Sequence, residues 1–176
     1  RRDEPQPSSA SLAALALSLG ADVPACLAGR ACIAEGRGEQ LSAPPAFPDL
    51  AAVLVNPGVG VSTAAVFRRF DARAAASGLL RPASPERFEH ASELFAWLAR
   101  QRNDLEAPAM EIAPVVAETL ARLGDAQECR LARMSGAGAT CFALVDDTAA
   151  AERLAMRLKS ARPGWWVQPC RLRGSS

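Results

Sequence analysis

The feature that most restricts the fold of this chain is the order of its apolar runs after residue 50. The apolar run from Leu50 to Val55 predicts a buried strand that ends at Asn56-Pro57-Gly58. Helices are predicted to follow at 63–70, 85–99 and 114–123, and then a strand at 129–134. A Gly-rich turn at 135–139, a strand at 140–145, a helix at 149–159 and a last strand at 165–172 complete the order. Helices that cover one face of a mainly antiparallel sheet satisfy this order, which predicts an α+β fold.

The segment before residue 50 predicts a short helix followed by a hairpin. Apolar residues at helical spacing predict a helix over 12–19, which Ser9 or Ser11 is expected to cap and which Gly20 ends. The short apolar pieces between glycines over 25–41 predict the two strands of a hairpin.

A cluster of prolines marks a predicted domain boundary. Proline punctuates a chain because it removes a backbone donor and fixes φ. We therefore expect one domain over 1–45 and a second over 46–176, with loops at 1–9 and 71–85, the latter punctuated by Pro82. The prolines at the boundary are Pro44, Pro45 and Pro48.

Charge and cysteine content exclude several classes of protein. Twenty basic residues against nineteen acidic ones give a net charge of +1, without the basic bias of nucleic-acid or membrane-surface proteins. Five cysteines without a C-x-x-C pair, and the single His90, argue against a zinc site and favour reduced thiols in the cytoplasm. No secretory signal is visible, and polar residues and Pro24 interrupt the apolar stretch 12–34 too often for a membrane helix.

Asp22 is the first candidate catalytic residue. It stands in Leu19-Gly20-Ala21-Asp22-Val23-Pro24, just after the predicted helix end. Gly20 is expected to permit a left-handed turn and Pro24 to stiffen the exit, so the carboxylate is held as a general base requires. Capping of the next element by the Asp22 side chain is the alternative, and the local pattern alone favours it.

A glycine loop between two predicted strands is the second candidate. The residues Ser135-Gly136-Ala137-Gly138 follow Met134, and glycines let backbone N–H groups approach an anion closely. A tight hairpin turn produces the same pattern.

The longer strings around both candidates resemble the GHMP kinase family. LGADVPACLAGRACIAEGRGEQL is similar to the segment LGADVPFC-x-x-G followed by G-x-G-E-x-L in the branch of that family that acts on a cytidine diphosphate-linked methylerythritol. The resemblance implies that Asp22 is the catalytic carboxylate, which accepts or orients the proton of the attacking substrate hydroxyl. Ala25 departs from the pattern, where the family carries a larger apolar residue.

The second string, RMSGAGATCFAL, is similar to the third GHMP motif, M-S-G-S-G-x-x-x-F. In the family this loop packs against the ATP-phosphate loop and lines the active site, a role that the resemblance carries to Ser135, Gly136, Ala137 and Gly138. Ala137 replaces the usual serine, which removes a hydroxyl and leaves the backbone donors.

Two weaker matches complete the resemblance. Residues 57–64 resemble P-x-x-x-V-S-T-A, and imply that Thr63 binds substrate and that Phe67 stacks near its base; the alternatives are a helix cap and a core residue. The residues Asn103 to Glu106 match the family's N-D-L-E, for which we expect a structural role against neighbouring loops.

The resemblance implies a ferredoxin-like C-terminal domain preceded by a remnant of the N-terminal, ribosomal S5 domain 2-like domain. It also implies ATP and Mg²⁺ as cofactors and phosphorylation of the 2-hydroxyl of 4-diphosphocytidyl-2-C-methylerythritol in non-mevalonate isoprenoid synthesis. The family's P-x-G-x-G-L-G-S-S-type phosphate loop does not occur here, and the chain begins at Arg1, so we expect a piece that is inactive alone. Another GHMP kinase and a non-catalytic ferredoxin-like binding module remain as alternatives.

Overall fold

The computed structural model of the chain describes residues 8–73 and 85–175. Most of the loops predicted at 1–9 and 71–85, with Pro82, lie outside the described residues. The chain divides into two compact units, one within 1–46 and the other within 47–174, and each is described here by itself.

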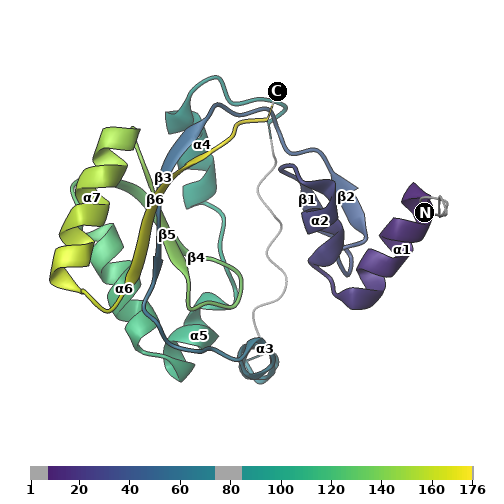
Figure 1. Cartoon of the computed structure of the whole chain (residues 1–176), viewed down its shortest axis with the longest axis horizontal. Helices are drawn as coiled ribbons and strands as arrows, with labels where there is room; N and C mark the ends of the chain where they lie inside the picture. Colours follow the sequence, from purple (N-terminus) through teal and green to yellow (C-terminus); the bar gives the residue numbers. More distant parts are fainter. Residues whose placement is uncertain (1–7, 74–84, 176) are drawn as a thin grey trace, which may run out of the picture. The chain divides into compact units, whose positions relative to one another are not determined.

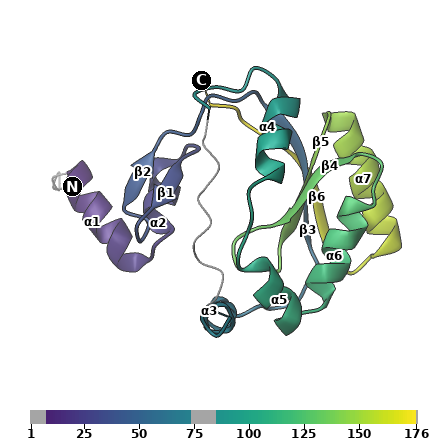
Figure 2. The same ribbon diagram turned by 180° about the vertical axis from the view of Figure 1, so that it is seen from behind.

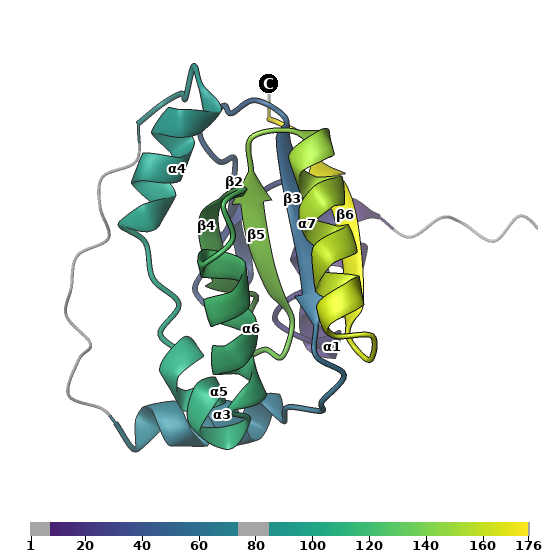
Figure 3. The ribbon, with the colours of Figure 1, turned by 90° about the vertical axis from the view of Figure 1, so that its left-hand side faces the viewer.

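The second unit is built on a four-stranded antiparallel sheet. Its strands are β3 (Leu50–Asn56), β4 (Cys129–Met134), β5 (Cys141–Val145) and β6 (Trp166–Leu172). The strand order is β4-β5-β3-β6, and every neighbouring pair is antiparallel. With helices between β3 and β4 and between β5 and β6, this is the βαββαβ plan of ferredoxin-like folds, as predicted (Figure 3).

Helices cover both faces of this sheet, whereas the sequence predicted only one covered face. One face carries α6 (Val115–Gly124) and α7 (Thr148–Ala161), and the other carries α4 (Ala91–Ala99) (Figure 1). Val53 and Val55 of β3 pack into the cluster that contains Leu123 and Leu154, while Leu50 packs in a second cluster with residues of α4. Burial on both faces explains why β3 is an uninterrupted apolar run.

The connection from β3 to β4 contains two further short helices, α3 (Thr63–Asp71) and α5 (Glu106–Ile112) (Figure 2). The helix α5 was not predicted from the sequence. The helix predicted at 85–99 is shorter in the structure, where α4 begins only after His90. There the Glu93 carboxylate accepts hydrogen bonds from the backbone N–H groups of Glu89 and His90, at 2.9 and 3.4 Å.

The first unit contains α1 (Ser9–Leu19), α2 (Val23–Ala28) and a hairpin of β1 (Ile33–Glu35) and β2 (Gln40–Ser42). The hairpin is therefore shorter than the predicted 25–41, because its first part forms α2, with Pro24 in the first turn. The cap of α1 is neither Ser9 nor Ser11, since the Ser8 hydroxyl accepts from the N–H of Ser11 at 3.2 Å.

The surface has exposed apolar side chains on α1 and two open edges on the sheet. Leu15 and Leu19 of α1 are 56% and 70% exposed, and α1 is apolar around most of its circumference. In the second unit β4 and β6 are the edge strands, and β6 contains Pro169. Within the described parts of the chain, every helix is too short or too polar to cross a membrane.

Candidate active site

Asp22 lies exposed at the start of α2. Its backbone is right-handed, with φ of −88°, and its carbonyl oxygen accepts from the N–H of Cys26 at 3.1 Å. Its side chain makes no capping hydrogen bond to α2, so the interpretation of Asp22 as a side-chain cap is wrong. Gly20 is extended, with φ of 162°, and not in the left-handed turn that we expected.

The turn of the hairpin, residues 36–39, packs closely against Ala21, the residue before Asp22. Gly38 has φ of +102°, and a Cβ on it would lie 1.9 Å from the carbonyl oxygen of Ala21. The Glu39 carboxylate closes the turn by accepting from the N–H of Arg37 at 2.6 Å. Backbone N–H groups of Glu39 itself and of Arg37 hold the pKa of the Glu39 carboxyl below its ordinary value. The G-x-G-E string thus builds a fixed turn beside the residue that precedes Asp22.

The glycine loop joins β4 to β5 through a tight turn. The N–H of Ser135 donates to the carbonyl of Thr140 at 2.9 Å, and the N–H of Gly138 donates to the carbonyl of Ser135 at 3.0 Å. Gly138 has φ of +88°, and a Cβ there would lie 2.8 Å from Met134 Sδ, so this position requires glycine. Among the described residues, the N–H groups of Gly136 and Ala137 donate no hydrogen bond within the protein.

Side chains from elsewhere in the second unit hold both ends of this loop. The Asn103 amide and the Glu106 carboxylate bond to the backbone at Met134 and Gly136, which agrees with the structural role expected for N-D-L-E. At the other end the Asn56 amide donates to the Thr140 hydroxyl at 2.9 Å. Sequence reasoning missed Asn56, for which an asparagine at a strand end before Pro-Gly was the one available signal.

Thr63 and Phe67 both lie on the exposed surface of α3. The helix cap is Ser62, whose hydroxyl accepts from the N–H of Ala65 at 3.3 Å, so the cap interpretation of Thr63 is wrong. Phe67 is 48% exposed and Val66 fills the core instead, so the core interpretation of Phe67 is wrong as well. Their predicted contacts with substrate stay a prediction.

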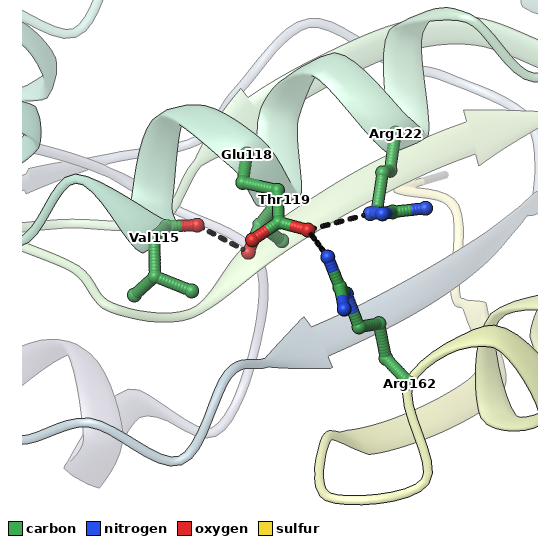
Figure 4. A network of polar contacts seen from close by, with 5 residues as sticks. All are labelled: Val115, Glu118, Thr119, Arg122 and Arg162. Atoms are coloured by element: carbon green, nitrogen blue, oxygen red, sulfur yellow. Dashed lines mark hydrogen bonds and ion pairs between the residues drawn. The ribbon is translucent and has the colours of Figure 1, made fainter.

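A network of ion pairs also lies on α6 and at the end of α7. Glu118 of α6 accepts from Arg122 at 2.8 Å and from Arg162, which follows α7, while the Thr119 hydroxyl donates to the Val115 carbonyl at 2.8 Å (Figure 4). The side-chain hydrogen bonds from Arg122 and then Arg162 lower the pKa of the Glu118 carboxyl. This network joins two helices on one face of the sheet, and we assign it to stability.

The described residues offer no ligand set for a resident metal ion. Three or more His, Cys, Asp or Glu side chains do not gather anywhere within residues 8–73 and 85–175 in a way that could hold one. The described residues therefore do not fit a metal centre of their own.

Comparison with known proteins gives the family. The family model described as GHMP kinases C terminal matches residues 75–163, which is half of the chain. The chain belongs to the GHMP kinase family. A 4-diphosphocytidyl-2-C-methyl-D-erythritol kinase of Caulobacter vibrioides is 53% identical over 169 residues, which cover 96% of this chain and 58% of that protein.

Solved structures agree with this assignment. A crystal structure of 4-(cytidine 5'-diphospho)-2C-methyl-D-erythritol kinase matches with a TM-score of 0.64 and 33% identity, over 93% of this chain and 58% of that one. A homoserine kinase from Cytophaga hutchinsonii shares the fold at a TM-score of 0.57 and 15% identity, over 86% of this chain and 51% of that one. The chain spans a little under 60% of the length of the curated relatives it matches.

Proposed function

We propose that this chain is part of a kinase that transfers the γ-phosphate of ATP to the 2-hydroxyl of 4-diphosphocytidyl-2-C-methyl-D-erythritol. The step belongs to non-mevalonate isoprenoid synthesis in the cytoplasm, and its partners are this small-molecule substrate and ATP. The observation that carries the proposal is the 53% identity to a relative of that name over nearly the whole chain, including the string around Asp22.

We assign to Asp22 the role of accepting or orienting the proton of the attacking hydroxyl. Its carboxylate is exposed and makes no capping hydrogen bond, so it is available to accept a hydrogen bond from a substrate. Phosphoryl transfer asks mainly for an in-line nucleophile and for stabilisation of spreading charge, and a positioned carboxylate provides the first of these.

The glycine loop is assigned contact with the anionic groups of the reaction. The N–H groups of Gly136 and Ala137 are adjacent and donate no bond to the described residues, and such paired donors suit a phosphate oxygen. On α3, the exposed Thr63 hydroxyl and Phe67 ring are assigned to the substrate, through hydrogen bonding and stacking respectively. Mg²⁺ is proposed to arrive with ATP, because these residues supply no ligand set for it.

A substrate panel tests the proposal. An enzyme of the relatives' full length that carries these 176 residues is incubated with ATP and with the cytidyl substrate, homoserine or mevalonate, and ADP release is measured. We expect turnover of the cytidyl substrate alone. The 176 residues without further sequence should show neither ATP binding nor turnover. Preferential phosphorylation of homoserine or mevalonate would contradict the proposal, and so would full activity of the 176 residues alone.

A further inference from the structure

Three hydrogen bonds join the N-D-L-E segment to the end of β4 and to the glycine loop. Asn103 Nδ2 donates to the carbonyl oxygens of Met134 at 3.0 Å and of Gly136 at 2.8 Å. Glu106 Oε2 accepts from the N–H of Met134 at 3.2 Å. One amide nitrogen thus joins the last residue of β4 to the second residue of the loop.

The position of Met134 in the sheet explains part of this arrangement. β4 is an edge strand, and Met134 pairs with Cys141 on its inner side only. An outer N–H and carbonyl at a sheet edge need partners from outside the sheet. Asn103 and Glu106 supply both partners with side chains, as an additional strand would with its backbone.

The hydrogen bond from Asn103 to Gly136 is not needed to satisfy the backbone groups at the sheet edge. Gly136 lies in the loop, beyond the end of the strand, and it is exposed with φ of +55°. Without Asn103, the exposed Gly136 carbonyl would accept hydrogen bonds from solvent water. The bond from Asn103 instead fixes the peptide unit between Gly136 and Ala137, whose N–H is one of the two available donors of the loop.

We infer that Asn103 and Glu106 are positioning residues that set the conformation of the glycine loop for phosphoryl transfer. The inference deepens the proposed function and rests on it for the catalytic role of the loop. Asn103 is itself held, because its Oδ1 accepts from the N–H of Leu105 at 3.1 Å at the start of α5. The other end of α5 is tied to α3 by Glu111, which pairs with Arg69 and with Arg73. A short helix therefore connects the glycine loop to the helix that carries Thr63 and Phe67.

The variant Asn103→Asp keeps the acceptor of this side chain and removes its donors. Aspartate keeps the oxygen that accepts from Leu105, but it loses both donors and faces the two carbonyl oxygens with an acceptor. We expect a fall of about 10²-fold in kcat/KM in the full-length enzyme, the scale of a misplaced catalytic contact. The melting temperature should fall as well, because the Met134 carbonyl loses its partner and faces a carboxylate. Selectively ¹⁵N-labelled glycine should show shifted amide resonances for Gly136 and Gly138.

The control Gln168→Glu introduces the same amide-to-acid change on the exposed edge strand β6, and it should leave kcat/KM and both resonances unchanged. A second pair of variants tests the same inference if Asn103→Asp fails to fold. Glu106→Gln keeps an acceptor for the Met134 N–H and should stay near the parent, whereas Glu106→Ala should resemble Asn103→Asp.

Two results would overturn the inference. The first is a folded Asn103→Asp variant with unshifted loop resonances or parental kcat/KM, which would leave Asn103 only the task of satisfying the sheet edge. The second is a Glu106→Ala variant that does not differ from Glu106→Gln. If the parent enzyme shows no kinase activity, the proposed function fails, and the glycine resonances still decide whether these residues set the loop.

Discussion

Gly38 lies so close to Ala21 that a Cβ on the glycine would come within 1.9 Å of the alanine carbonyl oxygen. The contact is with backbone, which cannot rotate away, and φ of +102° disfavours any side chain. Gly38→Ala should therefore lower the free energy of unfolding of the first unit by at least about 1 kcal/mol and raise hydrogen exchange over 21–42. Because the clash adjoins Asp22, kcat should fall too.

Gly20→Ala is the matched control in the same unit. Gly20 is extended, and its added Cβ would meet Val23 Cγ2 at 3.6 Å, an ordinary contact. Hydrogen exchange in this control should stay near that of the parent. A Gly38→Ala variant as protected as Gly20→Ala would show that the hairpin turn can move away from Ala21.

Asp22→Asn tests the catalytic carboxylate without changing the shape of the side chain. The structure shows no capping hydrogen bond to lose, so a thermal melt of the full-length enzyme should be unchanged. The kcat for the cytidyl substrate should fall by about 10²-fold or more, the usual scale for removing a general base. The exposed Asp125→Asn change serves as control and should leave kcat unchanged. If Asp22→Asn keeps most of its kcat, our catalytic assignment is wrong.

Local sequence patterns predicted most of the elements of the second unit. They failed at the start of α4 and at α5. Phe88 extended the apparent helical spacing of α4 because it packs in the same cluster as Leu94, although the helix begins only at Ala91. The helix α5 was missed because it is short and contains Pro108. That proline lies in the first turn, where its missing N–H removes no helical hydrogen bond.

In the candidate site, too, sequence patterns pointed to residues within one contiguous string and not to contacts between distant residues. The positions of Asp22 and of the glycine loop were readable because each lies in a contiguous string. The contact between Asn56 and Thr140 was not, because 84 residues separate the two in the sequence. The caps of α1 and α3 are Ser8 and Ser62, each one residue before a residue that we expected to cap. Neighbouring serines and threonines offer equivalent hydroxyls, and only backbone geometry selects among them.

The Glu118 network should make stability depend on pH. Its arginine partners lower the pKa of the folded carboxyl below the ordinary value of 4.5, so the stabilisation is complete above that value. It is lost as the pH falls through the lowered pKa of the folded state. The melting temperature of the parent should therefore exceed that of Glu118→Gln at about pH 7, and the difference should shrink as the pH falls below 4.5 and through the lowered pKa of Glu118.

The exposed Glu152 of α7 has no ion pair among the described residues, so Glu152→Gln provides the control and should show little difference over the same range of pH. A gap between parent and Glu118→Gln that stays constant across this range would mean that the pairs with Arg122 and Arg162 do not form in solution.

Cys141 should be chemically inert in the folded protein. Burial, and after it the charge of Glu106, raises the pKa of the Cys141 thiol to about 12. At about pH 8 roughly one thiol in ten thousand would then be ionised, and the thiolate is the reactive form. Iodoacetamide followed by mass spectrometry should modify the exposed Cys26 first and Cys141 only after unfolding in urea. Equal modification of both in the folded protein would contradict this expectation.

Each edge strand of the sheet is obstructed at one position against strand addition, and the means differ. At Met134 the side chains of Asn103 and Glu106 occupy the places that a neighbouring strand would take, and Pro169 removes an N–H from the opposite edge. Copies of this chain therefore have little opportunity to exchange strands or to grow into fibrils from these points. When such a chain self-associates, the contact should form through side chains, for which the exposed leucines of α1 offer the adhesive surface.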